Sequence, residues 1–116
     1  MAKNQQHAHH NHIALKVPEG TVSGQPVRVG AYTGVALIDR LPDGTATVWL
    51  DGSWTIDVAG AAKQGDVVYI TPAGTLTTTK TGNFPWGTAA ADKSTGTAPL
   101  EVAPFGKNPV SATAAA

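Results

Sequence analysis

Short runs of alternating apolar and polar residues, separated by turn residues, fill most of this chain. The pattern is clearest over residues 45–58, TATVWLDGSWTIDV, where two runs rich in β-forming residues flank Asp51-Gly52. An Asp-Gly pair between such runs is typical of a two-residue β-hairpin, because a type I′ turn needs φ > 0 at both central residues. We therefore predict a hairpin across Asp51-Gly52 and treat it as the centre of the fold.

The register of this predicted hairpin places Trp49 opposite Trp54. The two indoles would then meet across the strands as a non-hydrogen-bonded pair, in which side chains approach most closely. Ile56 belongs to the same face, and we expect that face to be buried, either in the core of the domain or against a second copy. The opposite face is mixed in polarity and carries Ala46, Val48, Leu50, Thr55 and Asp57.

Further alternating or β-rich runs predict strands over residues 13–17, 27–29, 35–38, 67–71, 75–79 and 100–105. Leu41-Pro42-Asp43-Gly44 and Pro72-Ala73-Gly74 are typical of reversals, the second with Gly74 in the left-handed region. Residues 80–99 are the least regular part, in which we expect Trp86 to plug an open end of a barrel. Thr75, Thr77 and Thr79 share a face that we expect to be exposed.

No window of adequate length shows a helical period, so we predict an all-β fold with about eight short strands in one small barrel or sandwich. The predicted domain covers residues 13–106. Residues 1–12 are polar, lack periodicity and contain all four histidines, which indicates a flexible arm that orders when it binds something. Residues 107–116 form a low-complexity tail of Pro, Ser, Thr and Ala.

The composition excludes several classes of function. A length of 116 residues suits one domain, and the eight basic and eight acidic residues leave no net charge. A nucleic-acid partner is not expected, because such binding needs clustered Lys and Arg. The absence of cysteine excludes disulfides and thiolate chemistry. No run approaches ~18 apolar residues and no signal peptide is recognised, so we expect a soluble protein made in the cytoplasm, without a membrane partner.

His7, His9, His10 and His12 form the only cluster with metal-ligand character. Closely spaced histidines on a flexible segment can chelate Zn²⁺, Ni²⁺ or Cu²⁺ opportunistically, whereas a catalytic zinc site needs ligands held by the fold. A tag is a further interpretation of this segment. We favour a solvated arm that contacts a partner, and we expect no metal site.

No catalytic residue and no cofactor are expected. The histidines lie in the predicted arm, so a Ser-His-Asp triad lacks its base, and no phosphate-binding loop occurs. Asp43, Asp51 and Asp66 each adjoin a glycine, which turn chemistry explains. Two alternatives stay open: a small hydrolase with a carboxylate pair, and a carbohydrate-binding or tail-associated adhesion module that uses Trp49, Trp54 and Trp86.

Several segments, in order, resemble the tailed-phage capsid decoration proteins, also called cement proteins. They are residues 17–20 (VPEG), 23–30 (SGQPVRVG), 34–37 (GVAL), 46–54 (ATVWLDGSW), 65–71 (GDVVYIT) and 74–77 (GTLT). The resemblance covers residues 13–106. The order and spacing of these segments carry it, because no single one is diagnostic.

This resemblance implies a β-barrel-like, tulip-shaped domain without enzymatic activity. It also implies homotrimers at local threefold positions on the outer surface of the virion, where they bind the major capsid protein, bridge capsomers and stabilise the filled head. The arm would reach onto the shell through Lys3, Asn4, Gln5, Gln6, His7, His9, His10 and His12. The histidine-rich segment and the tail are not features typical of the family.

Overall fold

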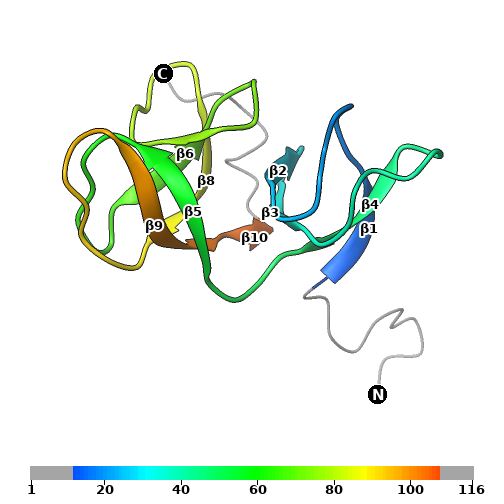
Figure 1. The fold of residues 1–116 in the computed structure, drawn as a ribbon, viewed down its shortest axis with the longest axis horizontal. Helices are drawn as coiled ribbons and strands as arrows, with labels where there is room; N and C mark the ends of the chain where they lie inside the picture. Colours follow the sequence, from blue (N-terminus) through cyan, green and yellow to red (C-terminus); the bar gives the residue numbers. More distant parts are fainter. Residues whose placement is uncertain (1–11, 108–116) are drawn as a thin grey trace.

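The computed structural model describes residues 12–107, and residues 1–11 and 108–116 lie outside the described part. The described part contains strands and no helix, which confirms the predicted all-β class. The strands form an open sheet and a closed barrel that lie side by side (Figure 1). They are β1 (His12–Lys16), β2 (Pro26–Val29), β3 (Tyr32–Ala36), β4 (Thr45–Trp49), β5 (Trp54–Ala59), β6 (Val67–Ile70), β7 (Leu76–Thr77), β8 (Phe84–Ala89), β9 (Thr97–Pro104) and β10 (Gly106–Lys107).

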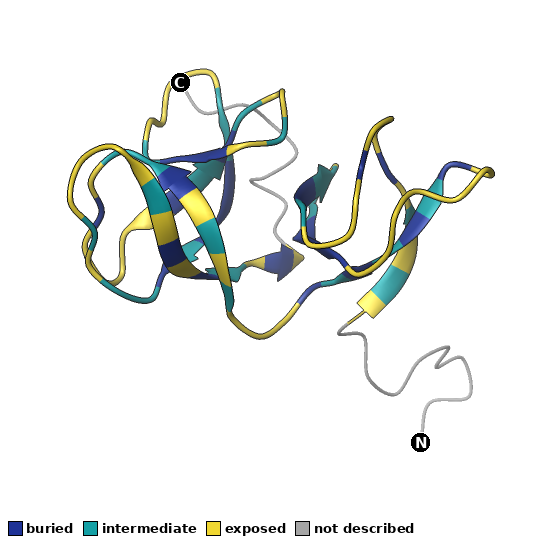
Figure 2. Ribbon diagram, viewed as in Figure 1, coloured by how far each residue is buried: buried dark blue, intermediate teal, exposed yellow. Residues whose placement is uncertain are grey.

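The open sheet is antiparallel throughout and connects β1, β4, β3 and β10 in that order. β4 and β10 pair with opposite ends of β3, and β2 pairs with β3 along residues 32–35. Burial alternates along β4, because every second residue of a strand points to the same face, and here that face is the inner one. The hydrophobic core of this lobe consists of Val17, Val27, Ala36, Ala46, Val48 and Leu50. In Figure 2 the strands of this lobe carry buried segments, in dark blue, between intermediate and exposed ones.

The barrel closes in the order β5-β7-β6-β8-β9, with β5 paired to β9 along a six-residue ladder. Closure leaves the barrel without a free edge strand. Gly87 permits the close approach of β8 and β9, because a Cβ there would overlap the carbonyl oxygen of Ala103. The buried residues of this core are Val35, Val58, Ala62, Val68, Ile70, Leu76, Trp86, Ala89, Leu100 and Val102.

Trp86 joins the two lobes. Its side chain belongs to β8 of the barrel and is fully buried. Its Nε1 donates hydrogen bonds to the carbonyl oxygens of Val27 (3.2 Å) and Gly34 (3.3 Å), which belong to the open sheet. Nearby, the guanidinium of Arg28 lies 3.6 Å from the centre of the Phe84 ring. The two lobes therefore share a packed and hydrogen-bonded contact.

The hairpin predicted across Asp51-Gly52 is wrong. β4 pairs with β1 and β3, whereas β5 pairs with β7 and β9, so the chain crosses from one lobe to the other between these strands. Gly52 has a positive φ of 82°, but in the described residues only glycines have positive φ, which leaves Asp51 out. A type I′ turn needs positive φ at both positions, so this pair does not form one.

The predicted pairing of Trp49 and Trp54 fails with the hairpin, because the two residues lie in different sheets. Both indoles are half-buried, as is Ile56, which packs against the barrel core. On β4 the buried face is the one predicted to be mixed, that of Ala46 and Val48. A role for Trp49, Trp54 and Ile56 at an interface with a second copy stays a prediction.

Other local predictions had mixed outcomes. The reversal at Gly44 is confirmed, with Gly44 N donating to Leu41 O at 2.9 Å, and so is the β6–β7 hairpin with Gly74 at a φ of 90°. Residues 84–87 do not cap the barrel, because they form part of β8. The expected exposure of Thr77 is also wrong, since its side chain contacts Ala59 and is buried.

Candidate functional site

The described residues offer little to hold a metal or to span a membrane. Within residues 12–107 no group of three or more His, Cys, Asp or Glu side chains is placed to bind a metal ion, and no helix is long and apolar enough to cross a bilayer. Of the predicted arm residues only His12 is described. Lys3, Asn4, Gln5, Gln6, His7, His9 and His10 lie outside the described residues.

The first surface of interest is the outer edge of β1. Within the described part of the chain, β1 pairs with β4 on one side and with no strand on the other. Val17 N donates to Gly44 O at 3.0 Å in the same register, and antiparallel pairing alternates along the strand. The backbone groups of Ile13 and Leu15 therefore face β4, while the N–H and C=O of Ala14 point outward from the sheet.

This edge has few of the features that protect edge strands. β1 contains neither proline nor an inward-pointing charge, and its ladder with β4 runs without a bulge. Ile13 and Leu15 are half-buried against the open-sheet core, while His12, Ala14 and Lys16 are exposed. The His12 ring stacks on Trp49 with centroids 5.0 Å apart. This contact fixes the residue at which the expected arm joins the sheet.

An apolar tip lies on the same lobe and consists of Val22, Leu37, Ile38 and Leu41, which are all exposed. These residues come from two loops that are tied together: Ser23 Oγ donates to Leu37 O at 2.9 Å, and Arg40 N donates to Thr21 O at 3.0 Å. Apolar side chains displayed on a fixed loop pair are typical of surfaces that contact another protein.

Two charged groups on this lobe have shifted pKa values. The Thr45 hydroxyl and backbone N–H both donate to Asp43, at 2.7 and 3.0 Å, and they hold the pKa of that exposed carboxyl below its usual value. Burial lowers the pKa of Arg28, which lies over Phe84.

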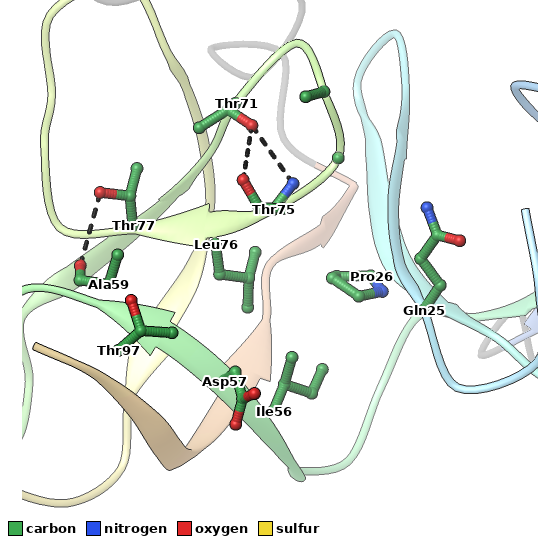
Figure 3. Close-up of a pocket in the computed structure, with 12 residues that line it drawn as sticks. Gln25, Pro26, Ile56, Asp57, Ala59, Thr71, Thr75, Leu76, Thr77 and Thr97 are labelled. Atoms are coloured by element: carbon green, nitrogen blue, oxygen red, sulfur yellow. Dashed lines mark hydrogen bonds between the residues drawn. The ribbon is translucent and has the colours of Figure 1, made fainter.

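The second surface is a groove between the two lobes, with a volume of about 630 Å³. Figure 3 shows Gln25 and Pro26 on the side of the open sheet, with Leu76, Thr75 and Thr77 facing them from the barrel. Among the lining residues within 12–107, Asp57 alone has a charged side chain, so the described part of the groove contains no carboxylate pair. The remaining lining residues are Ile56, Ala59, Thr71, Ala73, Gly74 and Thr97.

The carbohydrate platform of three tryptophans is not formed. Trp86 is fully buried, and Trp49 and Trp54 lie on different sheets. Sequence reasoning missed the groove, because its walls come from residues up to 72 positions apart, Gln25 and Thr97. The edge of β1 had a weak signal: a short apolar run without proline directly after the polar arm.

Two lobes, a β1 edge that no strand of residues 12–107 covers, and a groove between the lobes define a small all-β protein with surfaces suited to binding other polypeptides. The chain matches the family model described as phage cement protein over residues 6–104, and it belongs to that family. The match confirms the resemblance found in the sequence, and it includes the histidine-rich segment from His7 to His12. Comparisons with curated proteins and with solved structures gave no match. Membership of this family makes the chain a capsid-associated phage protein.

Proposed function

We propose that this protein binds the outer surface of an icosahedral phage head, bridges adjacent capsomers and stabilises the head once it is filled with DNA. The observation that carries the proposal is the family match over residues 6–104, combined with a described structure in which the features suited to protein binding gather on the open-sheet lobe. The partner is the major capsid protein. The role is structural rather than enzymatic.

The outward edge of β1 supports a specific mode of attachment. An extended segment of the shell can add to a free edge, where main-chain hydrogen bonds provide affinity. Residues 1–11 precede β1 directly, so the arm would order along the same neighbour and lose conformational entropy as it does so. In this proposal Lys3, Asn4 and the histidines from His7 to His10 contact the shell beside the edge.

The apolar tip supports a second contact. Val22 is 53% exposed and Leu41 45%, on loops held by backbone hydrogen bonds. Burial of such side chains contributes roughly 25 cal/mol per Å² of apolar area removed from water. Since the tip and β1 belong to one lobe, both contacts can form while the closed barrel faces outward.

We further propose that the protein acts as a homotrimer at local threefold positions of the shell. Three copies present three arms and three edges, and linked contacts raise avidity by about 10²–10⁴ over a single contact. Modest patches on each copy would then suffice to hold capsomers together against the pressure of packaged DNA.

The first test is the copy number of this chain relative to the major capsid protein in purified particles, measured by quantitative mass spectrometry with isotope-labelled peptides of both chains. We expect a ratio near one, because a trimer at each local threefold position supplies about one copy per shell subunit. Particles stripped of the protein and then saturated with it serve as the control. A handful of copies per particle would contradict the proposal and favour a tail-associated adhesion module.

A further inference from the structure

We propose that the groove between the lobes binds the C-terminal segment of the same chain, residues 108–116, as an extended strap. This inference concerns the free protein and does not depend on attachment to a shell. Both walls of the groove are described, and the segment begins directly after the last described residue, Lys107.

The starting point of the segment places the groove within reach. β10 ends at Lys107, which pairs with Tyr32 of β3, while the open-sheet wall of the groove includes Pro26, which pairs with Val35. Three residues along β3 span about 10 Å, and crossing from β10 past β3 to β2 adds about 10 Å. β10 is antiparallel to β3, and its direction at Lys107 points away from Val35, so the segment has to reverse before it can approach Pro26. Nine further residues can span up to ~30 Å, so the end of the segment can reach the groove after that reversal.

The shape of the groove favours an extended chain. The β6–β7 hairpin reaches across to the open sheet, where a Cβ on Gly74 would lie 3.2 Å from Gln25 Nε2. A smaller hollow of about 130 Å³ continues the space past Pro26 and Gly74 toward Pro18 and Arg28. A slot with walls from both lobes admits a single extended strand more readily than a folded domain.

The chemistry of the two partners also matches. The segment, NPVSATAAA, has no charged side chain, and alanine loses no side-chain entropy when it is fixed. The groove offers Pro26, Ile56 and Leu76 as apolar contacts. Three of its four threonine hydroxyls bond within the protein: Thr71 and Thr75 join at 2.9 Å, and Thr77 donates to Ala59 O (Figure 3). What the walls present to an occupant is therefore largely apolar.

A disulfide trap tests the proposal. Because the sequence contains no cysteine, the two introduced thiols have no native thiol to pair with. The pair Thr75→Cys and Ala115→Cys places one thiol in the groove and one near the end of the segment. The matched control pairs Ala115→Cys with Gln64→Cys, an exposed position beyond the opposite end of β6. Under mild oxidation we expect an intrachain disulfide that forms at least about tenfold faster in the groove pair, because docking raises the effective concentration.

A cross-link between two chains, or equal rates in the two pairs, would overturn the proposal. A second measurement applies even if the double variant fails to fold. A chain that ends at Lys107 should show shifted methyl NMR signals for Ile56 and Leu76, and a synthetic peptide of residues 108–116 should restore them. Unchanged methyl signals after truncation would likewise refute the strap. Because both measurements use the free protein, their failure would leave the copy number on particles, and the proposed function, untouched.

Discussion

At the scale of single residues, Trp86 contributes most to the joining of the two lobes. It is the largest fully buried side chain among the described residues, and its Nε1 donates to two carbonyl oxygens of the other lobe. A tryptophan side chain combines a large buried area with an indole N–H that needs a partner when buried. Trp86 meets both requirements, whereas Trp54 is half-buried and donates to Asp51 O near the surface.

We predict that Trp86→Phe lowers the free energy of unfolding by about 1–3 kcal/mol. The substitution removes the hydrogen-bond donor to Val27 and Gly34 and leaves space that the smaller ring does not fill. The measurement is the free energy of unfolding from urea titration. Trp54→Phe is the matched control, with an expected loss below about 1 kcal/mol. Equal losses in the two variants would show that Trp86 does not join the lobes in this way.

At the scale of elements, β1 combines two roles. Its inner face contributes Ile13 and Leu15 to the open-sheet core, while its outer edge presents the backbone groups of Ala14. Edge strands of this kind readily pair with another chain unless they are protected. The barrel strands lack this property, since each has a neighbour on both sides.

Ala14→Pro tests the edge directly. Proline removes the outward N–H of residue 14, and because that group does not bond to β4, the fold should be retained. We expect affinity for empty shells to fall by about tenfold or more, since each 1.4 kcal/mol corresponds to a factor of ten and the loss repeats in every copy of an oligomer. Affinity is measured by co-sedimentation.

Ala14→Val is the control for this experiment, because it keeps the N–H and suits a strand. It should bind as the parent protein does. If Ala14→Pro also binds with unchanged affinity while its circular dichroism is normal, strand addition at β1 is refuted, and the apolar tip or the arm would have to provide the attachment.

At the scale of the whole molecule, the two lobes depend on each other. Val35 belongs to β3 of the open sheet but is buried in the barrel core. After β9 the chain returns to the open sheet as β10, and Gly106 N donates to Thr33 Oγ1 at 3.1 Å. The path of the chain therefore crosses between the lobes twice, at residues 50–53 and near residue 105.

We predict a single cooperative unfolding transition for this reason. Urea curves from far-ultraviolet circular dichroism and from tryptophan fluorescence should coincide, as they do for small two-state domains. Trp49 reports on the open sheet in a Trp54→Phe variant, while Trp86 reports on the contact between the lobes. Two separated transitions would show that the lobes fold independently and that their shared contact is weak.

Local sequence was enough to locate most strands, several turns and the family. The β6–β7 hairpin was predictable because Gly74 and the flanking β-rich runs lie within a few residues of each other. The β1 strand was predictable from its alternation. The groove was not, because its walls meet only when the two lobes pack together.

The alternating pattern determined which residues share a face of each strand, since that property depends only on the period of the backbone. It did not determine which strands pair. Trp54 and Ile56 face Val102 and Leu100, more than forty residues later, and not the strand just before them. Strand pairing depends on the total burial and hydrogen bonding of the folded chain. Here β5 pairs within the closed barrel, and the local turn at Asp51-Gly52 does not form, since Asp51 lacks the positive φ that it requires. Only the tertiary structure could therefore decide that two lobes form, that β1 is an edge strand among the described strands and that a groove separates the lobes.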